Sequence, residues 1–151
     1  MGNLIQFKHS RCHFLYNFRF GKSVFHFRFE RTVRKDMRSG KLGDHWKEMM
    51  DQYPDGTATV TNALCYCPVC KQFQTEAQIS FYKPKEGYQP EFSSEDPDVI
   101  CFAPNHFELV EKEEMYCQKC GGKVEVFEDY MKVPCPKCGE YLDVKAGGWW
   151  D

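Results

Sequence analysis

The stretch from Cys117 to Cys138 decides the fold that this sequence predicts. It reads Cys117-Gln-Lys-Cys120, fourteen residues, and then Cys135-Pro-Lys-Cys138. Two cysteines separated by two residues can face one metal ion, because the tight turn between them points both sulfurs the same way. Two such pairs supply the four thiolates of a closed tetrahedral zinc site, which is structural because no position stays open for water. The spacing therefore predicts a zinc ribbon in which these four cysteines bind one ion, although a rubredoxin-type iron site would use the same ligands.

A third Cys-x-x-Cys pair, Cys67 and Cys70, needs two further ligands. His9 and Cys12 have the same spacing and precede a strand, as the Cys67 pair does. We expect these four residues to form a second structural site of three thiolates and one imidazole. The gap between its two halves would hold a helical insertion.

Cys101 and His106 are the alternative partners for that pair. Cys101 lies in the apolar run Val-Ile-Cys-Phe-Ala, where a thiol usually behaves as a small core residue, so we prefer the first pairing. Cys65 alternates with Cys67 and is expected to point elsewhere. The cofactor expected is two structural Zn²⁺ ions.

The composition favours a reducing compartment. The chain has 151 residues and nine cysteines, an odd number that a secreted disulfide framework would not pair completely. No signal-like apolar segment opens the sequence, and no run approaches the roughly 20 apolar residues needed to span a bilayer. We expect a cytoplasmic protein without membrane contact.

Aromatic residues dominate the region before the first helix. Phe14, Tyr16, Phe18 and Phe20 lie on one side with Asn17 and Arg19 on the other, and a similar alternation continues over 25–29. Period two on both sides of a glycine-containing break predicts a β-hairpin with a buried aromatic face.

Two amphipathic helices are expected next, followed by strands. The first is basic and ends near Gly40; the second has Asp44 as its N-cap and ends before Pro54. Further strands are expected at 57–64, 72–82, 98–103 and 107–110. The fold class is α+β, with small zinc-ribbon domains, antiparallel hairpins and a helical insertion. The expected domains are 1–83 and 98–151, joined by a proline-rich linker at 84–97.

The charge is unevenly distributed along the chain. Residues 1–50 carry eleven Lys/Arg and four Asp/Glu (+7), whereas residues 51–151 carry nine and eighteen (−9). The two halves could face each other within the molecule, or the basic half could meet a polyanion. In the second case the candidate nucleic-acid contacts are Arg31, Arg34, Lys35, Arg38 and Lys41.

The order of these landmarks resembles a group of small bacterial zinc-ribbon proteins common in Firmicutes. The resemblance covers nearly the whole chain and includes Gly40-Lys-Leu-Gly43, Trp46, Tyr53-Pro54 and the terminal Trp-Asp besides the four metal-binding pairs. In that group the first pair looks like Cys-x-x-Cys, whereas His9 stands in its first position here. The resemblance implies the metal sites and adds nothing on activity.

The function expected is that of a zinc-stabilised binding module that contacts nucleic acid or protein through its basic half. The alternative is a thiol-dependent redox protein or another enzyme with a reactive cysteine, Cys65 or Cys101. The sequence contains no Ser-His-Asp pattern, no His-Glu-x-x-His and no phosphate-binding glycine loop. Zinc storage or sensing is a third reading, which closed sites disfavour.

Overall fold

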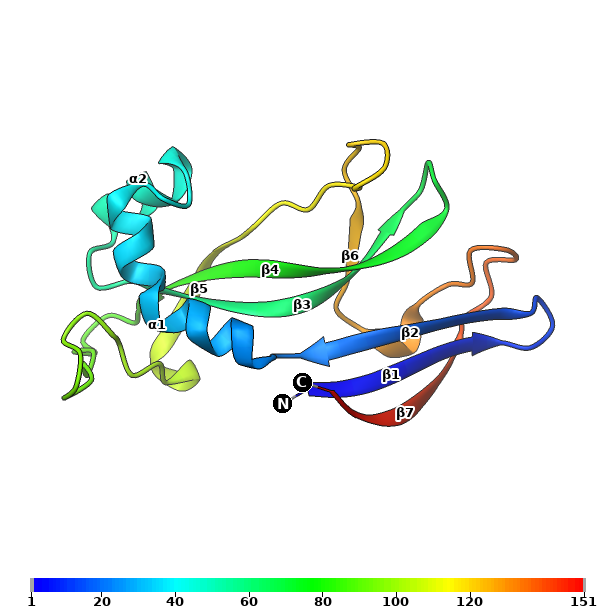
Figure 1. Cartoon of the computed structure of the whole chain (residues 1–151), viewed down its shortest axis with the longest axis horizontal. Coiled ribbons are helices and arrows are strands. Elements are labelled where there is room, and N and C mark those ends of the chain that lie inside the picture. The colour runs from blue at the N-terminus through cyan, green and yellow to red at the C-terminus, as the bar shows by residue number, and fades with distance from the viewer. Residues whose placement is uncertain (1, 151) are drawn as a thin grey trace. The chain divides into compact units, whose positions relative to one another are not determined.

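The computed structural model describes residues 2–150 (Figure 1). Within this range there are two α-helices, two short 3₁₀ helices and seven antiparallel strands in one sheet, ordered β5-β4-β3-β2-β1-β7 with β6 paired to β3. The elements are β1 (Gly2–His9), β2 (Phe14–Gly21), α1 (Val24–Ser39), α2 (Asp44–Gln52), β3 (Thr57–Cys67), β4 (Gln72–Pro84), η1 (Pro104–His106), β5 (Phe107–Lys112), β6 (Glu125–Phe127), η2 (Tyr130–Lys132) and β7 (Asp143–Trp150). The expected mixture of helices with antiparallel strands is confirmed. Neither α-helix in the described range is long and apolar enough to cross a membrane.

The chain forms two compact units, and each is discontinuous in sequence. Unit 1 contains the described residues of 1–24, 61–78 and 114–151, whereas unit 2 contains 25–60 and 79–113. These units differ from the contiguous domains expected from the sequence, because β3 and β4 contribute residues to both. Each unit has its own apolar core.

Unit 1 is built on a hairpin formed by β1 and β2. The register runs from Gly2↔Gly21 to His9↔Phe14, so the turn lies at residues 10–13. The expected hairpin across Gly21 is therefore wrong. The expected buried aromatic face of β2 is found in part, since Phe14 and Tyr16 are half-buried and Phe20 is exposed. Phe18 is fully buried there against Phe7 of β1.

The C-terminal part of unit 1 crosses from one long hairpin to the other. β6 pairs with β3 through Cys65↔Val126, and the ring of Tyr130 in η2 then packs on Phe18 at 5.3 Å. β7 pairs with β1 along its other edge, which the sequence did not reveal (Figure 1). The two short C-terminal turns are consequently held beside different hairpins.

Unit 2 contains both α-helices. The alternation over 25–29 belongs to α1 and not to a strand, so that expectation is wrong. Three aromatics with period two are too few to define a strand, and in the helix only Phe29 packs on the core, whereas Phe25 is 75% exposed. Val33 and Met37, one turn apart, form the fully buried stripe of α1.

The second helix, α2, packs Trp46 and Met50 into the same core. Its N-cap is Gly43, with φ 104° and no side-chain capping bond, so Asp44 is the first helical residue and not the cap as expected. A carboxylate in the first turn still complements the positive end of the helix dipole. The expected strand at 98–103 is reduced to an isolated bridge between Phe92 and Ile100.

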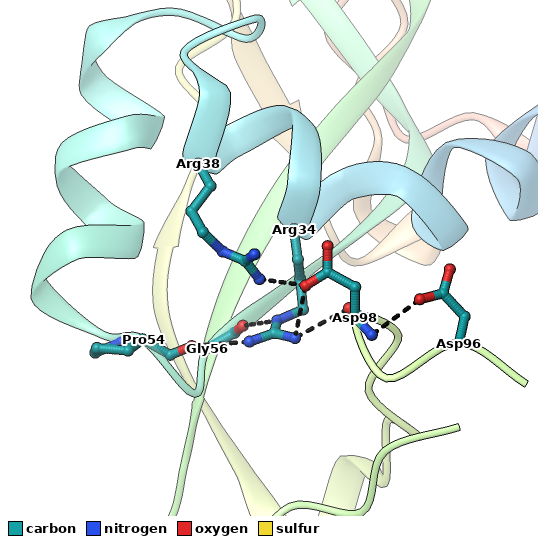
Figure 2. Close-up of polar contacts among 6 residues, drawn as sticks. All are labelled: Arg34, Arg38, Pro54, Gly56, Asp96 and Asp98. Atoms are coloured by element: carbon teal, nitrogen blue, oxygen red, sulfur yellow. Dashed lines mark hydrogen bonds and ion pairs between the residues drawn. The ribbon is translucent and has the colours of Figure 1, made fainter. Parts of the chain in front are cut away.

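Arg34 holds three segments of unit 2 together. Its side chain is 6% exposed, and its guanidinium donates to the carbonyl oxygens of Gly56 at 3.0 Å, Asp98 at 2.9 Å and Pro54 at 2.8 Å (Figure 2). Arg38, one turn further along α1, forms an ion pair with the Asp98 carboxylate. The helix thereby fixes both the turn before β3 and the loop before η1.

Replacing Arg34 by leucine should destabilise the protein by about 3 kcal/mol, because three carbonyl groups lose a charged donor. The measurement is denaturant unfolding of the metal-loaded protein. Arg31→Leu, at an exposed position of the same helix, is the matched control and should change stability by less than about 0.5 kcal/mol. Equal effects of the two variants would contradict the structural role of Arg34.

Candidate metal centres

Four short turns in unit 1 each carry two potential metal ligands separated by two residues. We call these turns knuckles. They comprise His9/Cys12 between β1 and β2, Cys67/Cys70 between β3 and β4, and the pairs Cys117/Cys120 and Cys135/Cys138 in the C-terminal segment. The two C-terminal knuckles close short hairpins, since the N–H of Cys117 donates to Gly122 O and the N–H of Cys135 donates to Glu140 O.

The structure brings these knuckles together in two clusters. The first, the histidine cluster, contains His9, Cys12, Cys135 and Cys138; the second, the all-cysteine cluster, contains Cys67, Cys70, Cys117 and Cys120. In each cluster the four ligand atoms lie within 4.8 Å of one another.

This grouping corrects the pairing expected from the sequence. Cys117 and Cys120 do not share a site with Cys135 and Cys138, and neither His9/Cys12 nor Cys101/His106 joins the Cys67 knuckle. The eight expected ligand residues are the same, but the clusters are nested along the chain. Hydrogen bonding of β6 to β3 places one C-terminal knuckle beside the β3–β4 turn. The path through η2 to β7 places the other beside the β1–β2 turn.

The separations within the clusters match a tetrahedral ion. Zn–S bonds of about 2.3 Å give S···S edges of about 3.8 Å, and one Zn–N bond gives an S···N edge of about 3.6 Å. Cys67 Sγ lies 3.6 Å from Cys120 Sγ, and Cys117 Sγ lies 3.9 Å from Cys70 Sγ. In the histidine cluster, Cys138 Sγ lies 3.5 Å from Nδ1 of His9.

All four knuckles share one backbone feature. The residue that follows the second ligand is left-handed in each: His13 (φ 53°), Lys71 (φ 54°), Gly121 (φ 73°) and Gly139 (φ 82°). Because non-glycine residues adopt this conformation rarely, its presence at His13 and Lys71 shows that the turn is imposed by its surroundings. The His9 knuckle therefore has the same form as the three that contain only cysteine ligands.

Backbone N–H groups stabilise negative sulfur in both clusters. Donors from Cys120 and Lys119 lower the pKa of Cys117 to about 6. Burial raises the pKa of Cys135, but the N–H groups of Lys137 and Cys138 outweigh it and hold that pKa below its ordinary value. Each cluster thus contains one buried cysteine that favours the thiolate, the form that binds metal.

A second cysteine in each cluster retains its proton. A hydrogen bond with Cys120, followed by burial, raises the pKa of Cys70 to about 12, and burial together with Cys138 and Cys135 raises that of Cys12 to about 11. A cation entering either cluster would displace such protons, since a metal and a proton compete for one sulfur lone pair. Each cluster is therefore able to hold a metal ion.

His9 is the only imidazole among the eight residues. Its side chain is 11% exposed, with Nε2 3.2 Å from Glu140 Oε2. Arg11 Nη1 donates to the other oxygen of the same carboxylate, also at 3.2 Å. Neither Glu140 nor Arg11 was among the residues predicted from the sequence. The available signal was that Cys138-Gly is followed by Glu140, whereas Cys120-Gly is followed by Gly122.

The remaining cysteines lie outside both clusters. Cys65 is fully buried in unit 1 beside Ala63, and burial raises its pKa to about 11. Cys101 is exposed in unit 2. His106 stacks on the ring of Tyr88 at 4.5 Å, so it serves packing there.

The candidate nucleic-acid contacts divide into two groups. Arg31, Lys35 and Lys41 are exposed on unit 2. Arg34 is turned inward as described above, and Arg38 is engaged by Asp98. Only the first three therefore present free-standing cationic groups to solvent.

Comparison of the chain with protein-family models, curated proteins and solved structures gives no match.

Proposed function

We propose that the protein is a structural zinc module that holds two ions in unit 1 and presents a surface to a partner. The observation that carries this proposal is the spacing of the ligand atoms. All four lie within 4.8 Å of one another in each cluster, and three of the separations are 3.5–3.9 Å, close to the edges of a tetrahedron around zinc. Each cluster supplies four ligands, so both centres are closed. Closed centres support a fold and leave no position for a reacting water.

Zinc is favoured over iron by the mixed ligand set. Rubredoxin-type iron needs four thiolates, which only the all-cysteine cluster provides, whereas zinc takes both Cys₄ and Cys₃His sets. The nine free thiols also suit a reducing compartment, and we propose the cytoplasm. The pairing of two knuckles with flanking strands supports the zinc-ribbon class and the resemblance described above.

The ions would replace part of the apolar core of unit 1. Buried ligand cysteines, Cys67, Cys117 and Cys135, are themselves members of its core clusters. Structural zinc contributes about 10–16 kcal/mol to folding of small finger peptides. Unit 2, by contrast, is closed by Trp46, Met50 and other apolar side chains.

Removing the metal should therefore unfold unit 1. We expect two zinc ions per chain by elemental analysis of the native protein. A strong chelator should collapse the amide NMR dispersion of unit 1, and two equivalents of zinc should restore it. Cys101→Ser, outside both clusters, should leave the stoichiometry at two. A full set of dispersed unit 1 signals in metal-free protein would contradict the proposal.

A polyanion is the partner that three exposed cations of unit 2, Arg31, Lys35 and Lys41, would suit, and we propose single-stranded nucleic acid. Arg31 and Lys35 lie one turn apart on α1, and the exposed rings of Phe25 and Phe27 precede them. Arg31 also lines a pocket of about 310 Å³ between α1, the start of β3 and residues 99–102, with Phe27 and Phe102 in its wall. Cations for phosphates beside aromatic surfaces for bases are what single-strand binding requires.

Neutralising Arg31, Lys35 and Lys41 together, each to glutamine, should weaken binding of a labelled oligouridine in fluorescence anisotropy. Each lost phosphate contact reduces the slope of log K against log salt by about 0.7, so the slope should fall by about 2. The same change at Lys119, Lys132 and Lys145, exposed in unit 1, is the charge-matched control. If the unaltered protein does not bind the oligouridine at low salt, the nucleic-acid proposal is wrong and a protein partner is the remaining candidate.

The alternative of a thiol-dependent enzyme has less support. Cys65 is inaccessible and its raised pKa disfavours the nucleophilic thiolate. The cluster cysteines are needed as ligands in the proposal above. Cys101 is the one exposed thiol outside the clusters in the described chain, and exposure alone does not make a thiol reactive.

A further inference from the structure

The histidine cluster requires one particular tautomer of His9. A neutral imidazole carries one N–H, and only the other nitrogen can bind a metal. Nδ1 faces the cluster at 3.5 Å from Cys138 Sγ, while Nε2 points to Glu140 at 3.2 Å. Binding of an ion through Nδ1 would therefore require the proton on Nε2, where it would be donated to the Glu140 carboxylate.

Arg11 fixes the carboxylate that accepts this proton. It belongs to the same knuckle as His9, and its Nη1 binds Oε1 of Glu140 while His9 binds Oε2. The two contacts occupy both oxygens of one carboxylate, so its plane is set relative to the ring. Arg11 and Glu140 have side chains 75% and 53% exposed, so this ion pair adds little stability and its effect is orientation.

The all-cysteine cluster has no such pair at the corresponding positions. Aligning the knuckles by their ligands places Val69 where Arg11 stands and Gly122 where Glu140 stands. Glu140 and Arg11 are thus present in the cluster that contains the His9 imidazole. The cluster in which Cys67 takes the place of His9 has neither an acidic nor a basic residue at these two positions. A thiolate needs no tautomer to be chosen, and a carboxylate beside it would repel it.

We infer that Glu140, held by Arg11, is the positioning residue that commits the His9 centre to an imidazole ligand bound through Nδ1. This inference rests on the proposed metal function. It makes the two clusters chemically distinct. The histidine cluster accepts an imidazole because Arg11 and Glu140 orient the ring. The all-cysteine cluster accepts a thiolate because Val69 and Gly122 stand at the corresponding positions. Partners of this kind typically contribute 10- to 100-fold to metal affinity.

Cobalt substitution of the full chain tests the assignment, because CoS₃N and CoS₄ centres have different absorption bands. Glu140→Ala should weaken cobalt binding at the His9 centre 10- to 100-fold in chelator competition, with the all-cysteine centre unchanged as internal control. Glu140→Gln keeps an oxygen acceptor and should recover most of the loss. A change below threefold, or equal weakening of both centres, would overturn the inference.

A second comparison separates ring orientation from general damage to the knuckle. With Glu140 in place, His9→Cys should bind cobalt poorly at the histidine cluster. His9→Cys combined with Arg11→Val and Glu140→Gly should restore cobalt binding at that cluster, so that the protein shows two CoS₄ centres. Additive effects of these changes would also overturn the inference. If the unaltered chain bound no cobalt at all, the proposed metal function itself would fail; two bound ions without any effect of Glu140 would defeat only the positioning role.

Discussion

The closure of each cluster by knuckles from distant parts of the chain is the constraint on which unit 1 depends. The β1–β2 turn meets Cys135 and Cys138, and the β3–β4 turn meets Cys117 and Cys120. The segment that supplies one knuckle leads through β6 and η2 to the knuckle of the other cluster, so both closures constrain the same C-terminal stretch of the chain. An ion in each cluster would contribute about 10 kcal/mol or more, comparable with the whole stability of an ordinary domain.

Different interactions stabilise the two units. Unit 1 packs aromatic side chains of β1 and β2 against Phe73 and Tyr130, and three of its cluster cysteines are members of its core clusters. In the function proposed above, a cation in each cluster completes this interior. Unit 2 has an apolar core under α1 and α2, and Arg34 ties the adjoining loops to that core through backbone carbonyls. Arg34, a candidate nucleic-acid contact in the sequence, is therefore an internal structural residue. Its neighbours Arg31 and Lys35 are exposed cations of α1.

The eight residues of the two clusters were predictable from the sequence, but the way their knuckles pair was not. A Cys-x-x-Cys turn is local, so each knuckle could be recognised from four residues, including the one that begins with His9. Which knuckles meet depends on hydrogen bonding between strands far apart in the chain, and the register of β6 on β3 leaves no local trace. The fourteen-residue separation of the last two knuckles fitted a self-contained ribbon equally well. The alternation of phenylalanines over 25–29 likewise predicted a strand, whereas these residues form the first turns of α1.

The nested pairing is tested most directly by counting zinc in two fourfold serine variants by native mass spectrometry. Replacing Cys67, Cys70, Cys117 and Cys120 removes one complete cluster, so the protein should retain one ion. Replacing Cys117, Cys120, Cys135 and Cys138 breaks both clusters and should retain none. One ion in the second variant and none in the first would contradict the account, because that result requires the last two knuckles to share a site.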